Sequence, residues 1–208
     1  MINDKYVNII GSGGHAKVVI SLLRSLDYQP LGIYDDDPRK KGTELMGVPI
    51  RGAVETIIYE REIPSIIAIG NNDVRKRISN AYKLNWLTLI HPRAYIDDTA
   101  KIDEGSVVFA GSIVQPFTRI GKHVIINTSA SIDHDCIIGD FCQIAPGVHL
   151  SGTVSLGEGS FLGTGCCTIQ NISVGEWTTV GAGAVVIHNL PSNCVAVGVP
   201  AKIIKNNQ

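Results

Sequence analysis

The stretch from Ile120 to Leu150 decides the fold, and it reads IGKHVIINTSASIDHDCIIGDFCQIAPGVHL. An aliphatic residue recurs in it at every sixth position, and the same register continues outward from Ile96 to Val186. Fifteen of the sixteen positions in this register are aliphatic, and the exception is Thr168. A period of six fits neither an α-helix nor an alternating strand, so it predicts a triangular solenoid with one short strand and one turn per face. Three such units close a coil, which gives about five coils.

Two further residue types accompany this aliphatic ladder. A small or β-branched residue usually lies four positions after each aliphatic residue, as at Ala130 and Cys136. Glycine often follows the aliphatic residue directly, as at Gly121 and Gly139. We expect the aliphatic side chains to point into the prism and to stack between coils. The glycines are expected to serve the corners, where a positive φ costs other residues about 1 kcal/mol or more.

The first ninety residues follow a different pattern. Short apolar runs at residues 6–10, 30–34 and 65–69 alternate with helical patterns, one of them over 16–23 and another carrying Arg75. Strands that alternate with helices predict a small parallel sheet of the Rossmann-like βαβ type, with ligands at the carboxyl ends of the strands.

A glycine-rich loop follows the first of these predicted strands. Residues 11–16 match the dinucleotide fingerprint Gly-x-Gly-x-x-Ala, and Asp35 and Asp36 lie about twenty residues further on. The fingerprint itself favours NAD. However, fewer than ninety residues supply only half of a doubly wound domain, so one nucleotide is easier to house than two. We therefore expect a nucleotide diphosphate pocket for a sugar donor, with phosphate at the start of the helix.

Composition and charge exclude several classes of protein. The 208 residues carry 18 Lys+Arg against 19 Asp+Glu, so the charge gives no reason to expect nucleic acid or an anionic membrane as the main partner. No apolar run reaches the length of a membrane span and no signal peptide is apparent, which predicts a cytoplasmic protein. The five cysteines form no Cys-x-x-Cys pair, so we expect small packing residues and neither a disulfide framework nor a zinc site.

His134 is the candidate catalytic residue of the solenoid. It lies two positions after the inward-facing Ile132, hence near a corner and pointing outward, and Asp135 follows it. A carboxylate beside an imidazole raises its basicity and can fix its tautomer. Cys136 occupies an inward position, so we do not expect a cysteine nucleophile. A metal site would need three convergent imidazoles, and no close histidine pair occurs, so no metal is predicted.

Together these segments resemble the hexapeptide-repeat sugar acetyltransferases that carry an N-terminal nucleotide-sugar domain. This family includes the sialic acid O-acetyltransferases, the perosamine N-acetyltransferases and the UDP-4-amino-sugar N-acetyltransferase of bacillosamine synthesis. The motifs that carry the resemblance lie at residues 11–15, 35–36, 68–75, 127–129, 134–136, 181–184 and 197–202.

The resemblance implies a fold, an activity and an assembly. The fold would be a small α/β nucleotide-sugar-binding domain over residues 1–90, followed by a left-handed parallel β-helix over 91–208. The activity would be acetyl-CoA-dependent acetylation of the 4-amino group of a UDP-linked 4-amino-4,6-dideoxy sugar in bacterial glycan synthesis. The assembly would be a homotrimer with active sites between subunits.

The same resemblance assigns roles to residues. His134 would be the general base for direct attack on the thioester, and Asp135 would raise its basicity. The nucleotide sugar would contact Gly13, Gly14, His15, Asp35, Asp36, Gly70 and Asn127. Acetyl-CoA would contact Gly152, Thr164, Gly181, Ala182 and Gln143. Gln143 stands where the family often has a second histidine, which puts that CoA contact in doubt.

Three alternatives remain open from the sequence. The first is O-acetylation of a sialic acid or another sugar, because the same base serves an amine and a hydroxyl. The second is an NAD-binding module, and the third is an inactive β-helix scaffold. The residues do not distinguish UDP, GDP and CMP as the nucleotide.

Overall fold

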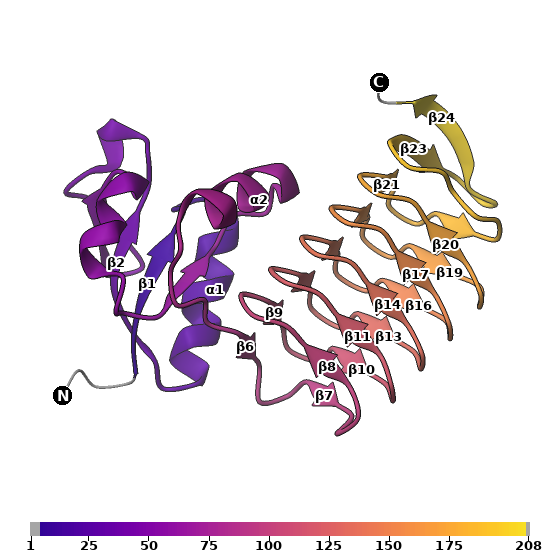
Figure 1. Cartoon of the computed structure of the whole chain (residues 1–208), viewed down its shortest axis with the longest axis horizontal. Helices are drawn as coiled ribbons and strands as arrows, with labels where there is room; N and C mark the ends of the chain where they lie inside the picture. The colour runs from indigo at the N-terminus through magenta and orange to yellow at the C-terminus, as the bar shows by residue number, and fades with distance from the viewer. Residues whose placement is uncertain (1–4, 207–208) are drawn as a thin grey trace. The chain divides into compact units, whose positions relative to one another are not determined.

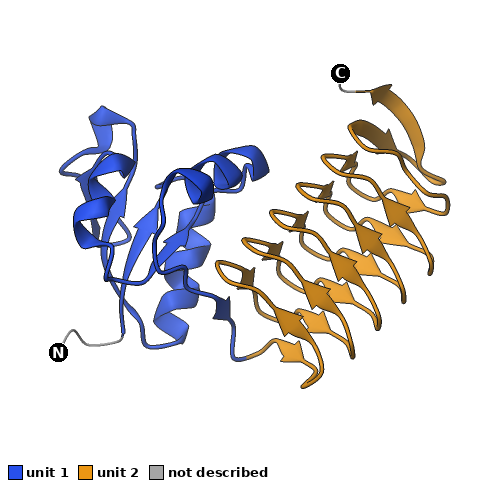
Figure 2. Cartoon of the chain, in the orientation of Figure 1, with its two compact units in different colours: residues 1–92 blue, residues 93–208 orange. Residues whose placement is uncertain are grey.

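The computed structural model describes residues 5–206. The chain divides between Pro92 and Arg93 into two compact units (Figure 2). The first unit is an α/β domain and the second is a prism of short strands (Figure 1). Neither helix among residues 5–206 has the length and apolar character needed to span a bilayer.

The first unit alternates strands and helices. Its elements are β1 (Tyr6–Ile10), α1 (Gly14–Ser25), β2 (Gln29–Tyr34), the 3₁₀ helix η1 (Pro38–Lys40), β3 (Glu44–Leu45), β4 (Val48–Gly52), the 3₁₀ helix η2 (Val54–Glu60), β5 (Ser65–Ile67), α2 (Asn72–Ala81) and β6 (Leu89–Ile90). Its five-stranded sheet has the order β3-β4-β2-β1-β5, in which β1, β2, β4 and β5 run parallel. This order places the carboxyl ends of β1, β2 and β5 side by side.

The expectation of a purely parallel sheet is wrong at one edge. Strands β3 and β4 pair antiparallel. Met46 and Gly47 connect them, and both have positive φ, 52° and 75°. Two consecutive residues with positive φ form the tight turn that suits a hairpin. The turn lies in a segment without the alternating apolar pattern of a longer strand.

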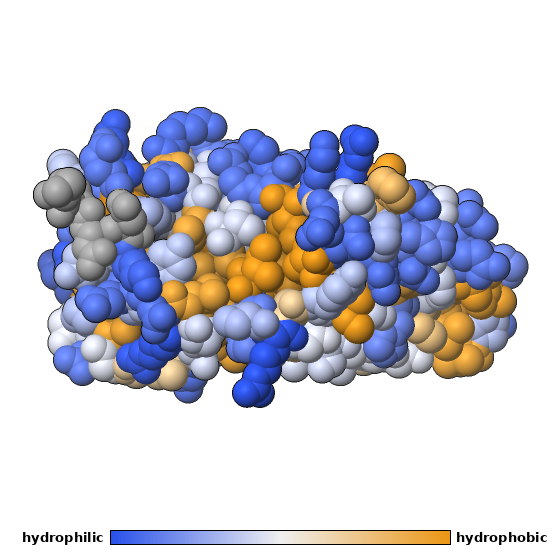
Figure 3. Space-filling view, turned by 90° about the horizontal axis from the view of Figure 1, so that it is seen from below, coloured by the Kyte–Doolittle hydropathy of each residue, from blue (hydrophilic) through white to orange (hydrophobic). Residues whose placement is uncertain are grey.

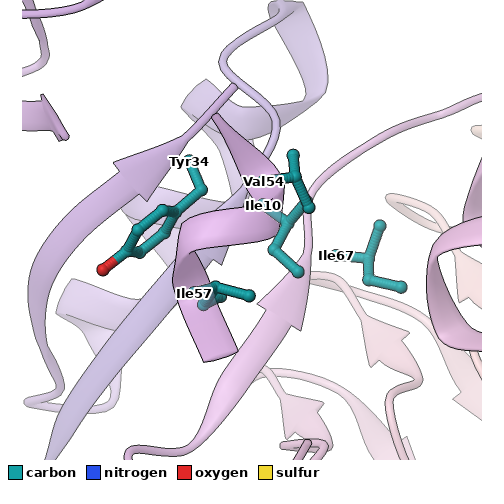
Figure 4. Packing of buried hydrophobic residues seen from close by; sticks show 5 residues of the cluster. All are labelled: Ile10, Tyr34, Val54, Ile57 and Ile67. Atoms are coloured by element: carbon teal, nitrogen blue, oxygen red, sulfur yellow. The ribbon is translucent and has the colours of Figure 1, made fainter. Parts of the chain in front are cut away.

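One side of the sheet packs on a cluster of five buried side chains, Ile10, Tyr34, Val54, Ile57 and Ile67. Figure 4 shows that they come from β1, β2, β5 and η2, so η2 covers this side of the sheet. Helix α1 buries residues at a spacing of three and four, namely Ala16, Val19, Ile20, Leu22 and Leu23. The loops that follow β1, β2 and β5 are thereby held on a packed core.

The second unit is a β-helix with three faces, in which the strands from residue 95 to residue 186 have two residues each and run parallel, whereas the last two strands are longer and pair antiparallel with each other. The first face has the order β22-β19-β16-β13-β10-β7, and the second has β20-β17-β14-β11-β8. The third face runs through β24, β23, β21, β18, β15, β12 and β9. The strands are β7 (Tyr95–Ile96), β8 (Lys101–Ile102), β9 (Val107–Val108), β10 (Ile113–Val114), β11 (Arg119–Ile120), β12 (Ile125–Ile126), β13 (Ser131–Ile132), β14 (Ile137–Ile138), β15 (Gln143–Ile144), β16 (His149–Leu150), β17 (Ser155–Leu156), β18 (Phe161–Leu162), β19 (Cys167–Thr168), β20 (Ser173–Val174), β21 (Thr179–Val180), β22 (Val185–Val186), β23 (Cys194–Val197) and β24 (Lys202–Asn206).

The strand pairing confirms the six-residue ladder. Val114 pairs with Ile132, and Ile132 pairs with Leu150, so one coil takes eighteen residues. These three side chains are at most 2% exposed. The small residues of the ladder also have a structural role, because buried hydroxyls donate to carbonyls of the next turn, as from Ser106 to Gly121 (2.8 Å) and from Thr118 to Asp133 (2.7 Å).

The glycines that directly follow the ladder residues do not serve positive φ, which corrects the expectation. Gly121, Gly139 and Gly157 are outside the left-handed region. A β-carbon at Gly139 would lie 2.8 Å from the backbone nitrogen of Glu158, one coil further on. These positions need glycine because the coils approach closely there. Positive φ occurs two residues later, at positions that glycine shares with other residues such as Phe141.

A matched pair of glycines separates backbone strain from packing. Gly159 and Gly165 both have φ of +68°, but a β-carbon at Gly159 would lie 2.5 Å from the Trp177 ring, whereas one at Gly165 would meet nothing within 4 Å. We expect Gly165→Ala to lower the free energy of unfolding by about 1 kcal/mol. Gly159→Ala should lower it by about 2–4 kcal/mol, because overpacking is added to strain. Denaturant unfolding at one protein concentration measures both, and equal losses would contradict the packing argument.

The surface mixes polar and apolar residues. Figure 3 shows one side of the molecule, on which exposed apolar residues (orange) lie among polar and charged ones (blue). The exposed apolar side chains of the β-helix include Ile113, Phe117 and Ile137, which are 38%, 64% and 58% exposed. Exposed apolar residues that lie near one another are typical of contact surfaces.

Candidate active site

The glycine loop after β1 forms a pocket at the carboxyl edge of the sheet. The pocket has a volume of about 300 Å³, and its lining residues are Gly11, Ser12, Gly13, Gly14, His15, Asp35, Lys40, Ala68, Ile69 and Gly70. Helix α1 begins at Gly14 without a side-chain cap, so its first N–H groups are available to a ligand. The structure thus brings together five of the six residues predicted for the nucleotide sugar in this unit, Gly13, Gly14, His15, Asp35 and Gly70.

Asp35 supports the loop from below. One carboxylate oxygen accepts hydrogen bonds from the Ser12 amide (2.9 Å), from the Ser12 hydroxyl and from Lys40 Nζ (3.2 Å), and the other accepts from the Asp37 amide (3.0 Å). Burial alone would raise the pKa of Asp35, but the hydrogen bonds from Ser12, Asp37 and Lys40 outweigh it and lower the pKa below its ordinary value. The carboxylate is therefore ionised at neutral pH and holds the loop in shape.

His15 is neutral in this pocket. Burial, with a further contribution from the positive charge of Arg75, lowers the pKa of His15 to about 4. Arg75 is 1% exposed and donates to the carbonyls of Ile69 (3.1 Å) and Gly70 (3.0 Å). This buried guanidinium fixes the loop after β5 beside the glycine loop. Its role was not apparent from the sequence, where Arg75 belongs to a basic helical face.

Asp36 is not brought into the same pocket. Its carboxylate accepts a hydrogen bond from the Val54 amide (2.8 Å). It lines a second cavity of about 300 Å³, together with Val54, Val74, Arg77, Ile78, Ala81 and Tyr82. Consecutive residues at a strand end point to opposite sides, which separates Asp36 from Asp35. The two aspartates therefore face different cavities.

His134 lies on the turn between β13 and β14, and its imidazole points outward with 55% of the side chain exposed. Its Nδ1 lies 2.8 Å from the Asp135 carboxylate. Asp135 has φ of +59°, a conformation that aspartate tolerates better than most residues, and this backbone geometry turns its side chain toward the preceding histidine. The His134 amide also donates to Asp133 Oδ1 (2.8 Å). Asp135 thus contacts the imidazole, whereas Asp133 contacts the main chain of the same histidine.

Gly152 lies beneath the imidazole, one coil further along the β-helix. A β-carbon at Gly152 would lie 2.6 Å from Cε1 and 2.7 Å from Nε2 of His134. The glycine therefore gives the ring a flat surface on which to lie. The Thr153 amide donates to the His134 carbonyl (2.9 Å), so the two turns are joined through the backbone.

The carboxylates control the basicity of His134. The hydrogen bond that the imidazole donates to Asp135, together with the charges of Asp133 and Asp135, raises the pKa of His134 above its ordinary value. A general base acts in its neutral form, so activity should fall with decreasing pH as His134 becomes protonated. Asp135→Asn should move this acid limb of kcat/KM to lower pH and lower the plateau, because the base is weaker and less well oriented. A pH–rate profile of both proteins measures this, and an unmoved acid limb would contradict it.

The residues predicted for acetyl-CoA lie mainly on a different edge of the prism. We call the turns that lead from the β13 face to the β14 face the base edge, and the turns that lead from the β12 face to the β13 face the second edge. His134 and Gly152 lie on the base edge, whereas Thr164, Gly181 and Ala182 lie on the second edge. Thr164 and the 181–183 turn are adjacent, since the Gly183 amide donates to the Thr164 carbonyl (2.8 Å).

The two remaining predicted residues lie apart from these groups. Asn127 is also on the second edge, but three coils before Gly181, and its side chain accepts from the Thr128 amide (2.9 Å). Gln143 projects from β15, on the β12 face. The structure therefore brings Gly152 to the base and does not bring Gln143 or Asn127 to it within one chain.

A groove that sequence reasoning missed lies on the face between the two edges. It has a volume of about 410 Å³, and its lining residues are Ile113, Gln115, Ser131, Ile132, Asp133, His149, Leu150, Ser151, Cys167 and Thr168. The Ser131 hydroxyl and His149 Nδ1 lie 2.8 Å apart in it. The outward residues Ser131, His149 and Cys167 are eighteen positions apart, which is one coil. This spacing is the sequence signal that could have identified the groove.

The burial of the cysteines follows from the same coil geometry. Cys136, Cys142, Cys166 and Cys194 are buried as expected, whereas Cys167 is only half-buried because it points outward into the groove. Burial raises the pKa of the Cys136 thiol, which disfavours a thiolate. Among residues 5–206, no three His, Cys, Asp or Glu side chains are grouped so as to hold a metal ion.

Comparisons with known proteins agree with this architecture. Residues 6–82 match the PglD N-terminal domain, and residues 117–152 match the bacterial transferase hexapeptide (six repeats). UDP-N-acetylbacillosamine N-acetyltransferase of Bacillus subtilis (strain 168) is 40% identical over 112 residues, which is 51% of this chain and 52% of that protein. The chain spans about half the length of that protein and of GDP-perosamine N-acetyltransferase of Escherichia coli O157:H7, which is 28% identical over 109 residues.

Solved structures resemble the chain over nearly its whole length. PerB from Caulobacter crescentus, in complex with CoA and GDP-perosamine, has a TM-score of 0.91 and 39% identity and covers 99% of both chains. The acetyltransferase domain of PglB from Neisseria gonorrhoeae, in complex with acetyl coenzyme A, has a TM-score of 0.89 and 37% identity over 97% of this chain and 100% of that one. These matches confirm the expected fold class, a small α/β domain followed by a left-handed parallel β-helix. The chain belongs to the family of hexapeptide-repeat sugar N-acetyltransferases that includes the perosamine and bacillosamine enzymes.

Proposed function

We propose that the chain transfers an acetyl group from acetyl-CoA to the 4-amino group of a nucleotide-linked 4-amino-4,6-dideoxy sugar. The observation that carries this proposal is the His134–Asp135 pair, held on an outward turn by a 2.8 Å contact. Its support from relatives is the full-length resemblance to PerB, a protein solved with CoA and GDP-perosamine.

The proposed mechanism is direct attack without an acyl-enzyme. Asp135 accepts a hydrogen bond from the Nδ1–H group of His134, which leaves the Nε2 lone pair to act as the base. The amine nitrogen attacks the thioester carbonyl, the C–N bond forms, and His134 takes a proton from that nitrogen. The C–S bond then breaks, and protonated His134 gives its proton to the CoA sulfur, so CoA leaves as a thiol and the base is neutral again. Cys136 is buried and has a raised pKa, which supports a mechanism without a cysteine nucleophile.

The glycine-loop pocket is proposed to hold the nucleotide diphosphate. The start of α1 offers N–H groups to phosphate, and Lys40 adds a positive charge at the rim. The neutral His15 can donate or accept a hydrogen bond without adding charge. Both proposed substrates are cytoplasmic metabolites, so the proposal places the reaction in the cytoplasm.

We also propose a homotrimer with its active sites between subunits. The base edge and the second edge are separated by one face of the prism, so the base and the predicted acetyl-CoA residues Thr164 and Ala182 do not meet within one chain. Prisms packed around a threefold axis would bring the base edge of one copy beside the second edge of its neighbour. The exposed Phe117 and Ile137 flank the base edge and would be covered in such a contact.

An assay of thiol release tests the proposal. The protein is mixed with acetyl-CoA and, in parallel, with a UDP-linked 4-amino sugar, GDP-perosamine, a CMP-linked amino sugar and free sialic acid. The sequence prediction of a UDP sugar and the resemblance to PerB favour different nucleotides, and the acceptor that gives the fastest thiol release decides between them. If sialic acid is the only acceptor that gives thiol release, the result supports O-acetylation instead. If none of the acceptors gives thiol release, the proposed activity is wrong. Sedimentation at several protein concentrations tests the trimer.

A further inference from the structure

Two carboxylates flank His134, but only one of them contacts the imidazole. Asp135 is bonded to Nδ1, whereas Asp133 accepts a hydrogen bond from the His134 main-chain amide through Oδ1 (2.8 Å). The backbone of Asp133 is fixed as well, since its amide donates to Leu150 (3.0 Å) and its carbonyl accepts from the Thr118 hydroxyl (2.7 Å). Asp133 is therefore a rigidly placed anion beside the base.

The second oxygen of Asp133 is available to a ligand. No donor among residues 5–206 bonds to Oδ2, and no lysine or arginine of that range lies within ion-pair distance of the carboxylate. Asp133 lines the groove of about 410 Å³ on the β13 face and is the only carboxylate among its lining residues. The other titratable groups of the groove are His149 and Cys167, and His149 Nδ1 pairs with the Ser131 hydroxyl and not with Asp133. A half-buried carboxylate without a cation favours a cationic ligand.

We propose that Asp133 binds the ammonium form of the acceptor's amino group and so positions the amine beside His134. This inference rests on the proposed function. An amino sugar carries an ammonium at neutral pH, whereas a hydroxyl acceptor carries no charge and gains little from an anion. Asp133 is thus a specificity-determining residue that selects an amine over a hydroxyl, a choice that the base alone does not make.

The proposal separates binding from turnover. An ammonium must lose one proton before its lone pair can attack, so a carboxylate that stabilises the ammonium helps binding and does not speed the chemical step. Asp133→Asn also removes a charge that raises the pKa of His134, so the comparison is made on the plateau of the pH–rate profile, where the imidazole is neutral in both proteins. There the substitution should raise KM for the amino sugar about tenfold and leave kcat within about threefold. Asp133→Glu should restore part of the affinity, since it keeps the charge.

The deciding experiment compares two ligands that differ in one group. Binding of the best nucleotide-linked 4-amino sugar and of its 4-hydroxy counterpart is measured by calorimetry at pH 7 with the wild-type protein and with Asp133→Asn. The wild type should prefer the amino sugar about tenfold, and the variant should lose that preference while it binds the hydroxy sugar as before. Asp97→Asn is the matched control, because Asp97 lies two coils earlier at the same turn position and its carboxylate is bonded to Thr99.

Each outcome decides. A preference that persists in Asp133→Asn overturns the inference, and so does an equal loss of affinity for both ligands, which would mean a structural role. A loss of preference in Asp97→Asn as well would show that the effect is not specific to Asp133. If the wild type binds neither ligand and releases no thiol, the proposed function itself fails, independently of Asp133.

Discussion

Replacing His134 with alanine is expected to lower kcat by about two to four orders of magnitude, the range that general-base catalysis contributes. The exposed imidazole is the group bonded to Asp135, and no other histidine shares that turn. Its removal takes away the proton acceptor for the attacking amine. Because the side chain is 55% exposed and the turn is held by backbone bonds, the melting temperature should change little. Single-turnover thiol release measures the chemical step directly.

His188→Ala is the control for this variant. His188 is exposed and lies two residues after β22, as His134 lies two residues after β13, so it occupies the same turn position three coils away. Its substitution should leave kcat within about threefold of the wild type. If His134→Ala turned over at the wild-type rate, the imidazole would not be the general base. Catalysis would then rest on the positioning of the two substrates alone.

The sequence predicted the β-helix because its fold repeats. Each ladder residue, such as Ile132 or Ile138, contacts only its neighbours one coil away, so a local pattern contains the whole architecture. The outward direction of His134 and the burial of Cys136 follow from the same register. The N-terminal glycine loop was also predictable, because its function depends on consecutive residues.

Contacts between residues far apart in the sequence were less accessible. The η2 helix and the β3–β4 hairpin carry no strong periodic signal, and the divergence of Asp36 from Asp35 depends on the Val54 amide. The burial of Arg75 depends on two carbonyls in the preceding loop, although its helix is polar in sequence. The reason for Gly121 and Gly139 was misassigned, since close approach of the next coil and positive φ favour the same residue type.

The contact between Gly152 and His134 is the clearest case of a functional feature that requires the coil length. The two residues are eighteen positions apart. This spacing predicts a contact only because three six-residue units close one coil. The resemblance to the family marked Gly152 as a contact of acetyl-CoA. The structure gives it a second role, because its missing side chain is the space in which the imidazole lies.

Gly152→Ala is therefore expected to lower kcat by about a hundredfold while the fold persists. A methyl group there would lie 2.6–2.7 Å from two ring atoms of His134, and the exposed ring can swing away, so the strain is relieved by moving the base and not by unfolding the turn. A displacement of about 1 Å from a productive geometry is sufficient for such a loss. Kinetics of Gly152→Ala, with a melting temperature alongside, measures both effects.

A double-mutant cycle tests whether the effect passes through the imidazole. If Gly152 acts by supporting His134, the double variant His134→Ala with Gly152→Ala should be no slower than His134→Ala alone, because the displaced group is already absent. If the methyl group instead blocks acetyl-CoA, the two losses should multiply and KM for acetyl-CoA should rise in both backgrounds. The cycle thus shows whether Gly152 acts through His134 or through the binding of acetyl-CoA. Losses that multiply would mean that Gly152 does not act by supporting His134.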